Sequence, residues 1–425
     1  MKVIYDISVL GTGYQHNARA GVFRVVENLA YSLTNSQECD LSFCSSFSLE
    51  TLNYSLAYLK DNPQFARIPF VSSRFEKTAY RKLTTLFDKV NSVPNLSLSL
   101  KIWRKLLFHT IKVIEYDSLA LDSKNLREID IFHSPYYPLP EQSKKITNLK
   151  RFITIYDLIP VLYPHFFDSN IKDVFDRILP SIEMRDWVIC ISQATKYDLC
   201  NYLTNIDSSR VFVTHLAASE LFYQCKNLNK ITFIRSKYGI PPDVPYILSL
   251  STLEPRKNIA HTIRCFSKLV QEQNIKYLYL VLVGKKGWKY DSLFKEISNN
   301  ASVKERIIVT GYVADEDLAA LYSGAMAFVY PSFYEGFGLP PLEAMQCGVP
   351  VITSNTSSLP EVVGDAGIML SPTDSEGLCQ SMFDLYNSSS LREAMSLKSV
   401  EQAKQFSWNK FTQETISAYK TSLSS

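Results

Sequence analysis

The chain has 425 residues, a length that predicts two or three domains. Apolar residues make up 46% and charged residues 20%, which is typical of a globular enzyme, and the net charge of +3 is too small to indicate a nucleic-acid partner. Eight cysteines are scattered without a C-x-x-C pair, so their spacing favours reduced thiols and gives no support to a zinc site.

The N-terminus, MKVIYDISVL, is too short and too interrupted for a signal peptide, because Asp6 stands where the apolar stretch should continue. We expect a buried strand there instead. The sequence contains no run of 18 or more apolar residues, so we expect no transmembrane helix. The expected location is therefore the cytoplasm, with a peripheral place on the inner face of the cell membrane as an alternative.

Short apolar runs alternate with longer segments of helical periodicity, the pattern of βαβ units around a parallel sheet. In the first half we predict strands at 3–10, 129–134, 151–157, 186–192 and 211–217. In the second half we predict strands at 246–251, 277–284, 306–311, 325–331 and 349–354. The clearest helix spans 258–273, with Asn258 as its N-cap.

The pattern is interrupted at about 222–245, which predicts an α/β protein of two doubly wound domains facing each other. We place the first domain at 1–222 and the second at 223–406. In such sheets ligands bind beyond the carboxyl ends of the strands. The loops that follow the strands are therefore the candidate functional segments.

An insertion at about 60–128 does not fit this alternation. Between Arg74 and Lys112 there are nine Lys or Arg residues and two Asp or Glu residues, interleaved with Trp103 and other apolar side chains. The segment 74–112 suits contact with an anionic membrane surface or a lipid-linked acceptor. The alternative is a core helix with a solvated basic face.

The segment YEGFGLPPLEA, residues 334–344, follows the strand expected at 325–331 and places two glutamates around a glycine-rich turn. Its prolines predict a helix that begins near Leu339, and Gly348 is placed to end it. The turn then leads into a helix N-terminus, which suits a phosphate. Glu335 and Glu343 could each accept hydrogen bonds from two hydroxyls. This layout suits a nucleotide sugar, which joins polyol, phosphate and polyol in series.

The loop TLEPRKN, after the strand expected at 246–251, carries two adjacent cations, Arg256 and Lys257. Arginine forks onto phosphate oxygens and lysine adds a point charge. Such groups stabilise a leaving pyrophosphate more than the ground state, and could replace a divalent metal. The predicted strand ends carry no Asp-x-Asp, so we expect no metal and no cofactor besides the sugar donor.

These segments resemble the C-terminal half of retaining GT-B glycosyltransferases of family 4 (glycosyl transferases group 1), in particular the mannosyl- and rhamnosyltransferase-like members. The resemblance is dense over about 245–372 and rests on STLEPRKNI, LVGKKGW, VTGYVADEDLAALYSGAMAFVYPS, YEGFGLPPLEAMQCGVPVI and SSLPEVVGDAG. Glu335 and Glu343 match the family's E-x7-E spacing. The resemblance implies two Rossmann-like domains across a cleft, with the C-terminal helix, 407–425, crossing back onto the first domain.

The resemblance also implies roles for individual residues. Glu335 would contact the donor sugar, Arg256 and Lys257 would bind the pyrophosphate, and these three are the expected catalytic residues. Glu343 would hold the ribose. The sugar and phosphates would be approached by the turn, which consists of Gly336, Phe337, Gly338 and Leu339. The base would be bordered by Tyr312 and Val313.

In the first half, RAGVFRVVENL resembles the family's glycine-rich start of the first helix, which assigns Gly21 and Arg24 to the donor side. Phe23 replaces a residue that is often glycine or glutamine. The segment CISQATKYDL resembles a helix start that Ser192 would cap.

The segment IYDLIPVLYP resembles one that usually begins His-Asp on the acceptor side. Here Tyr156 replaces the histidine and Asp157 remains. His133, in a neighbouring strand-end loop, could fill part of the acceptor-side role or be a structural histidine.

The expected function is transfer of a hexose, with retention, from a nucleotide-diphosphate sugar to a hydroxyl of a glycan or lipid-linked glycan. GDP-mannose is the first expectation for the donor, and bacterial polysaccharide, O-antigen or capsule biosynthesis for the context. The alternatives are a nucleotide-sugar epimerase, a glycoside hydrolase, an NAD-dependent oxidoreductase, and a glycan-binding module without turnover. The oxidoreductase is disfavoured because GTGYQH, after the first strand, lacks G-x-G-x-x-G.

Overall fold

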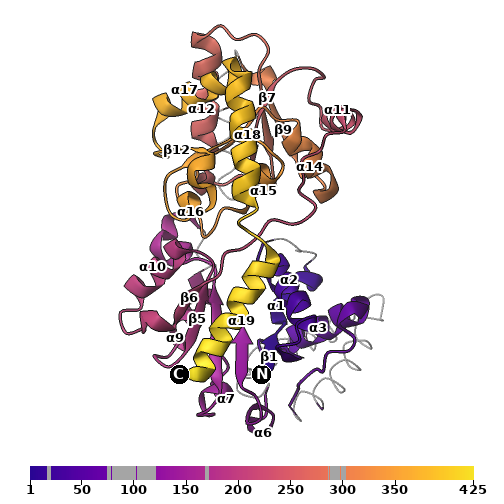
Figure 1. Cartoon of the computed structure of the whole chain (residues 1–425), viewed down its shortest axis with the longest axis vertical. Coiled ribbons are helices and arrows are strands. Elements are labelled where there is room, and N and C mark those ends of the chain that lie inside the picture. The colour runs from indigo at the N-terminus through magenta and orange to yellow at the C-terminus, as the bar shows by residue number, and fades with distance from the viewer. Residues whose placement is uncertain are drawn as a thin grey trace.

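Alternating strands and helices build two six-stranded parallel sheets, one in each half of the chain. The computed structural model describes residues 1–16, 21–73, 121–167, 172–285 and 303–425, together with residues 78, 102, 287 and 297. The two halves lie one above the other in Figure 1, and both chain ends lie in the lower half.

The first sheet has the strand order β2-β1-β3-β4-β5-β6, and every neighbouring pair is parallel. Its strands are β1 (Lys2–Asp6), β2 (Asp40–Cys44), β3 (Ile131–Ser134), β4 (Lys150–Ile155), β5 (Trp187–Cys190) and β6 (Val211–Val213). The helices described with it are α1 (Ser8–Gln15), α2 (Val22–Thr34), α3 (Leu49–Asp61), α6 (Ser123–Leu126), α7 (Glu141–Lys144), α8 (Ile159–Leu162), α9 (Lys172–Ser181) and α10 (Gln193–Tyr202). The short 3-10 turns are η1 (Pro63–Phe65), η3 (Pro164–Phe166) and η4 (Ser208–Arg210).

The second sheet has the order β12-β11-β10-β7-β8-β9 and is also parallel throughout. Its strands are β7 (Tyr246–Leu250), β8 (Tyr279–Val283), β9 (Ile307–Gly311), β10 (Ala327–Tyr330), β11 (Val351–Ser354) and β12 (Ile368–Leu370). Its helices are α11 (Leu228–Lys237), α12 (Ile259–Glu272), α14 (Asp315–Ser323), α15 (Leu339–Gln346), α16 (Leu359–Val363), α17 (Ser375–Asn387) and α18 (Ser389–Ala403), followed by α19 (Trp408–Ser424). The 3-10 turns here are η5 (Pro255–Lys257), η6 (Lys304–Arg306) and η7 (Gly364–Ala366).

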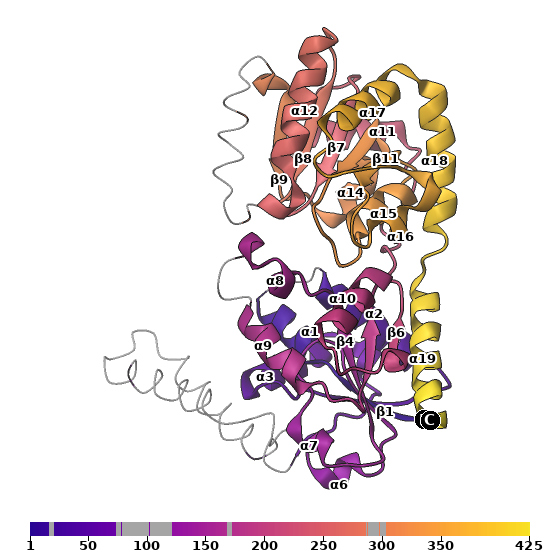
Figure 2. The ribbon, with the colours of Figure 1, turned by 90° about the vertical axis from the view of Figure 1, so that its left-hand side faces the viewer.

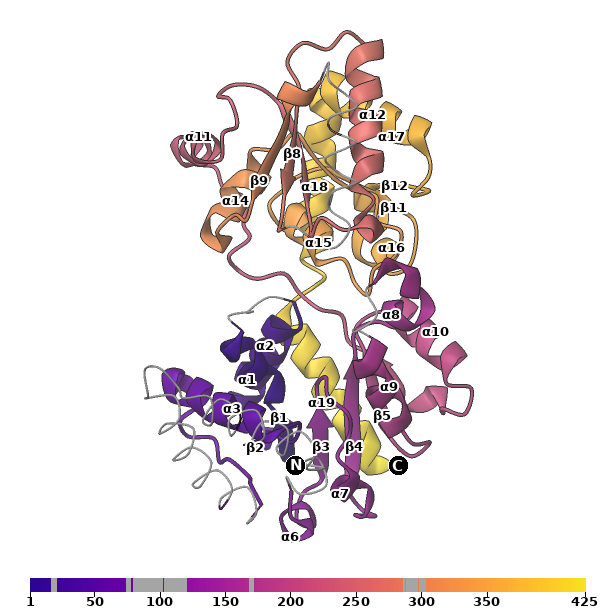
Figure 3. The ribbon, with the colours of Figure 1, turned by 180° about the vertical axis from the view of Figure 1, so that it is seen from behind.

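Helices cover both faces of the second sheet, so its central strands are buried on both sides. In β7, Tyr246 and Leu248 pack into one apolar cluster, while Ile247 between them packs into the cluster that contains α12. Figure 1 shows α18 in front of this sheet, and Figure 3, from behind, shows α12 in front of it. The doubly wound architecture expected from the sequence is confirmed.

The predicted strands all occur, and the sheets contain two further strands that were not predicted, β2 and β12. Both are edge strands, of five and three residues. The strand predicted at 3–10 is wrong at its end, because the chain turns after Asp6 and α1 begins at Ser8. The Asp6 carboxylate accepts the Ser8 N–H at 2.8 Å, a local bond that replaces the sheet pairing.

The predicted helix caps have mixed outcomes. Asn258 stands at the N-cap of α12, but its side chain donates to the carbonyl oxygens of Pro331 and Pro372 and makes no capping bond. Ser192 caps α10 as expected, accepting the Thr195 N–H at 3.0 Å.

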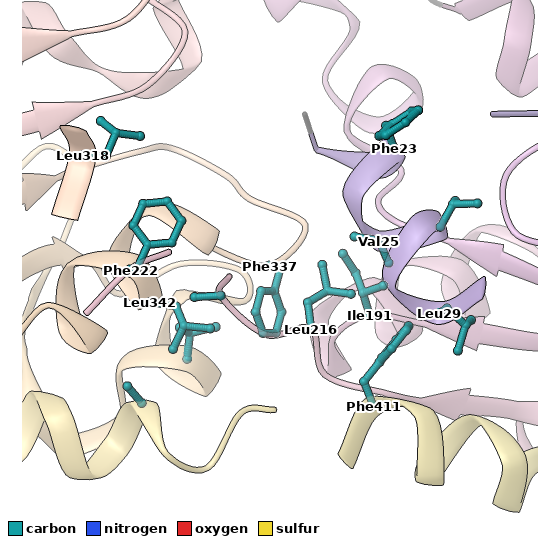
Figure 4. Close-up of a cluster of buried hydrophobic side chains, with 14 of the residues drawn as sticks. Phe23, Val25, Leu29, Ile191, Leu216, Phe222, Leu318, Phe337, Leu342 and Phe411 are labelled. Carbon is teal, nitrogen blue, oxygen red and sulfur yellow. The ribbon is translucent and has the colours of Figure 1, made fainter. Parts of the chain in front are cut away.

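The last helix, α19, leaves the second half and lies along the first, as Figure 2 shows. It packs against α2, and its Tyr419 is fully buried. One continuous apolar cluster joins the two halves through residues that include Phe337, Leu216, Val25 and Phe411 (Figure 4). Burial of this apolar surface stabilises the arrangement of the halves.

The basic segment 74–112 lies almost entirely outside the described residues, so its predicted membrane contact stays a prediction. Within the described part of the chain, none of the helices combines the length and apolar composition needed to cross a bilayer.

Candidate functional site

The principal cavity has a volume of about 550 Å³ and lies where the carboxyl ends of strands from both sheets face each other. This volume is within the range of about 300–1,000 Å³ that is usual for small-molecule sites. The first half contributes Gly21, Val22, Val25, Tyr156, Asp157, Ile191 and Leu216. The polar residues of the second half that line it include Ser251, Thr252, Glu254, Arg256, Lys257, Lys285, Tyr312, Asp315 and Glu335.

The glycine-rich turn lines this cavity at Gly336, Phe337 and Gly338, and α15 begins at Leu339 as predicted. Gly338 has φ of +118°, a conformation that disfavours any side chain. Gly348, with φ of +72°, follows the C-cap of α15. Pro340 and Pro341 carry no N–H, so Leu339 is the residue in the first turn of α15 whose amide can face an anion, and the positive end of the helix dipole favours an anion there.

Gly336 is required for a different reason, the close approach of the two halves. A Cβ atom at this position would lie 2.4 Å from the Tyr156 carbonyl oxygen and 2.9 Å from Asp157 Cβ. The turn of the second half therefore rests directly on the loop after β4 of the first half.

Glu335 lies at the centre of a buried network of charges. Its Oε1 accepts from Lys257 Nζ at 2.7 Å, from Ser332 Oγ at 2.6 Å and from the Tyr330 hydroxyl at 2.9 Å. Its Oε2 pairs with Arg256 Nη1 at 2.9 Å. Together these partners fix the position of the Glu335 carboxylate on the cavity wall.

These contacts keep the charges of the network in place. Burial alone would raise the pKa of Glu335, but Arg256 and Lys257 lower that pKa to about 2. Burial lowers the pKa of Lys257, although Glu335 opposes the change. For Arg256, Glu335 and Glu254 outweigh burial and raise the pKa of the guanidinium. Glu335 and Arg256 thus present two opposite charges on the cavity wall.

Glu254, which was not predicted from the sequence, pairs with Arg256 Nη2 at 2.7 Å. Arg256 and Lys257 are therefore balanced by two carboxylates, Glu254 and Glu335. Glu254 stands in the same strand-end loop as Arg256, and this position is the feature of the sequence that indicates a place in the site. Lys285, two residues after the end of β8, was not predicted either, and it supplies a third cation on the wall.

Tyr312 and Val313, expected to border the base, both line the cavity. The Tyr312 ring is 62% exposed, and Lys285 Nζ lies 5.0 Å from its centroid. An exposed aromatic face beside a cation suits a flat, electron-rich ring.

Glu343 lies beside the cavity, on α15, but is not among the residues that line it. Its carboxylate accepts from the Tyr322 hydroxyl at 3.1 Å, and burial raises its pKa to about 7. Arg24 of α2 pairs with Asp315 of α14, so this ion pair joins the two halves near Glu343. Gly21, with φ of +57°, lines the cavity before α2.

The expected acceptor-side residues separate in the structure. Tyr156 and Asp157 line the cavity, but His133 is fully buried, and the acceptor-side assignment of His133 is wrong. Its ring bonds the Tyr419 hydroxyl at 2.5 Å and Thr154 Oγ1 at 2.8 Å. Burial lowers its pKa to about 3, so His133 is a neutral side chain that ties α19 to the first sheet.

The described residues contain no group of three or more His, Cys, Asp or Glu side chains arranged to hold a metal ion.

The fold and this cavity define a two-domain α/β protein with a site lined by charged side chains between its halves. Residues 230–402 match the family Glycosyl transferases group 1. The chain is 36% identical over 290 residues to the O-antigen chain mannosyltransferase B of Escherichia coli, covering 68% of this chain and 74% of that protein. The chain belongs to the glycosyl transferases group 1 and is a glycosyltransferase, so its substrates are a nucleotide sugar and a glycan acceptor.

Other relatives agree with this placement. The serotype-specific mannosyltransferase WbdA of E. coli is 32% identical over 262 residues, which cover 61% of this chain and 32% of WbdA. A glycosyltransferase structure from Rickettsia africae covers 99% of this chain and 98% of its own, with a TM-score of 0.66 at 18% identity. The structure of Anabaena HepE in complex with UDP and glucose covers 99% of this chain and 100% of its own, with a TM-score of 0.64 at 16% identity. These likenesses confirm the GT-B architecture of two Rossmann-like domains.

Proposed function

We propose that the protein transfers a mannosyl group, with retention of anomeric configuration, from GDP-mannose to a hydroxyl of a growing glycan such as an O-antigen or a related bacterial polysaccharide. The observation that carries this proposal is the charged network of Glu335, Arg256 and Lys257 on the wall of the cavity, beside the N-terminus of α15. The mannosyltransferase names of the relatives support the choice of sugar.

The donor is proposed to lie along the second half. Its diphosphate would face Arg256, Lys257 and Lys285 together with the amides of the turn. Glu335 would accept hydrogen bonds from the sugar hydroxyls, because its low pKa keeps it ionised. Glu343 would hold the ribose from its place on α15. The departing phosphate is then stabilised by protein cations, and we propose that the reaction needs no divalent metal or other cofactor.

The acceptor is proposed to bind in a smaller cavity of about 210 Å³ in the first half. Val22, Tyr156, Asp157 and Arg256 line both cavities, so a hydroxyl in the smaller one can approach a donor in the larger one. Its other walls are largely apolar and aromatic, which suits the faces of a sugar ring: Tyr136, Ile155, Ile159, Pro160, Phe167, Phe175 and Ile178.

Asp157 is the carboxylate shared by the two cavities. Its Oδ1 accepts the Ile159 N–H at 2.9 Å, which fixes the side chain, and burial raises its pKa. We propose that Asp157 orients the acceptor hydroxyl. The proton of that hydroxyl would pass to the departing phosphate.

The donor is tested by thermal shift with GDP-mannose, GDP, UDP-glucose, UDP-N-acetylglucosamine and UDP. A ligand at 100 times its Kd should add about 2.7 kcal/mol to the free energy of unfolding. We expect this shift with GDP-mannose and GDP. A shift confined to the UDP compounds would contradict the proposed donor, and a sugar that remains attached to its nucleotide after turnover would contradict transfer.

The acceptor cavity is tested by Phe175→Trp, which fills it, with Leu162→Ala on the neighbouring exposed surface of α8 as the control. We expect Phe175→Trp to raise the KM for acceptor by about tenfold or more and to leave the Kd for GDP-mannose unchanged. An unchanged KM for acceptor would place the acceptor elsewhere.

A further inference from the structure

A short segment at the start of α16 contacts the backbone of the glycine-rich turn. Ser357 Oγ accepts the Glu335 N–H at 2.9 Å. The fully buried Ser358 hydroxyl lies 3.0 Å from the Glu335 carbonyl oxygen and 2.6 Å from that of Phe337, and donates between them. The backbone on both sides of the Glu335 carboxylate is therefore fixed by this segment.

The same segment reaches across to the first half through Glu361. The Glu361 carboxylate accepts the Gln193 N–H at 2.7 Å and the Ala194 N–H at 2.8 Å, the first two amides of α10. His215 Nε2 lies 3.2 Å from the same carboxylate, on the chain that connects the halves. A carboxylate on the first amides of a helix forms charge-assisted hydrogen bonds with its positive end.

A third contact closes the network on the opposite side of the turn. Thr195 Oγ1, in the first turn of α10, lies 3.3 Å from the Gly336 carbonyl oxygen and 3.1 Å from that of Tyr156. The start of α10 thus contacts the turn directly at Gly336 and indirectly through Glu361 and α16.

We infer that Ser357 and Glu361 are positioning residues that couple the closure of the two halves to the placement of Glu335. This inference rests on the proposed function, in which Glu335 contacts the donor sugar. When the halves close, Glu361 binds the start of α10, and the segment that holds the Glu335 backbone is locked against the first half. The donor sugar then meets Glu335 in its working position when the acceptor cavity is also complete.

The backbone of Ser357 supports a functional role for its hydroxyl. Ser357 has φ of +52°, a left-handed conformation that costs energy in any residue with a Cβ. Glycine would adopt this backbone without that cost. The chain nevertheless carries serine here, and its hydroxyl holds the Glu335 N–H.

Ser357→Gly is therefore the sharpest test, because it relieves the backbone and removes the hydroxyl. We expect the melting temperature to be unchanged or higher. The kcat for transfer should fall by about tenfold, with the Kd for GDP unchanged, because the diphosphate faces Arg256 and Lys257. A kcat within about twofold of wild type would overturn the role of Ser357.

Glu361→Ala tests the coupling between the halves, with Glu376→Ala as the matched control. Glu376 is an exposed carboxylate in the first turn of α17, in the same half. In Glu361→Ala we expect the amides of Gln193 and Ala194 to exchange with solvent about tenfold faster and kcat to fall by about tenfold, while Glu376→Ala changes neither. Unchanged exchange, or a kcat that falls only in proportion to the folded fraction, would overturn the inference.

The two proposals fail in distinguishable ways. If the wild-type chain transfers no sugar from any nucleotide sugar, the proposed function fails. The exchange of the α10 amides in Glu361→Ala still reports whether Glu361 joins the halves. If Glu361→Ala showed wild-type exchange of these amides and a wild-type transfer rate, the coupling between domain closure and Glu335 would be refuted, and the proposed function would remain intact.

Discussion

Replacing Arg256 with alanine tests the electrostatic basis of the proposed function. The guanidinium pairs with Glu254 at 2.7 Å and Glu335 at 2.9 Å and donates to the Tyr334 carbonyl oxygen at 2.6 Å. Breaking a buried ion pair costs about 3–5 kcal/mol, and the lower value applies because Lys257 still pairs with Glu335. At about 2–4 °C per kcal/mol, the melting temperature should fall by about 6–12 °C.

The effect on rate is expected to be larger than the effect on folding. At an effective dielectric of about 20, a cation about 4 Å from a phosphate contributes about 4 kcal/mol before desolvation. That energy corresponds to about a thousandfold in rate, so Arg256→Ala should slow release of the nucleoside diphosphate at saturating donor by about two to three orders of magnitude.

The double variant Glu254→Ala/Arg256→Ala separates the two effects. It removes the carboxylate that the single variant leaves without its partner, so the melting temperature should recover toward that of the wild type. The rate should remain low, because the cation is still missing. A folded double variant that releases nucleoside diphosphate within about threefold of the wild-type rate would refute the phosphate-binding role of Arg256.

Three further predictions follow from the site. Burial raises the pKa of Glu343 to about 7 from the usual 4.5, so the stability that this group contributes is present below pH 4.5 and is lost as the pH rises through 7. Glu343→Gln should therefore flatten the pH dependence of the free energy of unfolding, measured with urea across that range. Gly336→Ala should hold the halves apart, because the added Cβ would clash with Tyr156. We expect the transfer rate to fall by about tenfold or more and the radius of gyration in X-ray scattering to increase. An unchanged radius of gyration would contradict the close contact. A chelator such as EDTA should leave the transfer rate within about twofold of its untreated value, and rescue by added Mg²⁺ would disprove metal independence.

The sequence by itself determined the alternation of strands and helices. Residues such as those of β8 and β10 form continuous apolar runs, the pattern of strands buried on both faces. The edge strand β12 escaped prediction because it has only three residues, and β2 because the polar residues Asp40 and Ser42 interrupt its apolar residues. The change from strand to helix after Asp6 also escaped, because it depends on a hydrogen bond between a side chain and the backbone.

The sequence also placed the glycine-rich turn and the two adjacent cations on the cavity wall. Glycine at 336 and 338, the prolines that start α15, and the cations after β7 are local signals that do not depend on long-range contacts. A strand end in a parallel sheet places its loop at the same edge as its neighbours, so the positions of Arg256 and Glu335 on one edge followed from the order of the elements.

The tertiary structure alone decided which charges meet. Lys257 and Glu335 are separated by 78 residues, and Glu361 lies 168 residues from Gln193, so no local pattern reports these pairs. The burial of His133 also depends on a distant residue, because its partner Tyr419 lies on α19, 286 residues further along the chain. The energy of a buried charge or ring depends on every group packed around it, and those groups come together only when the chain has folded.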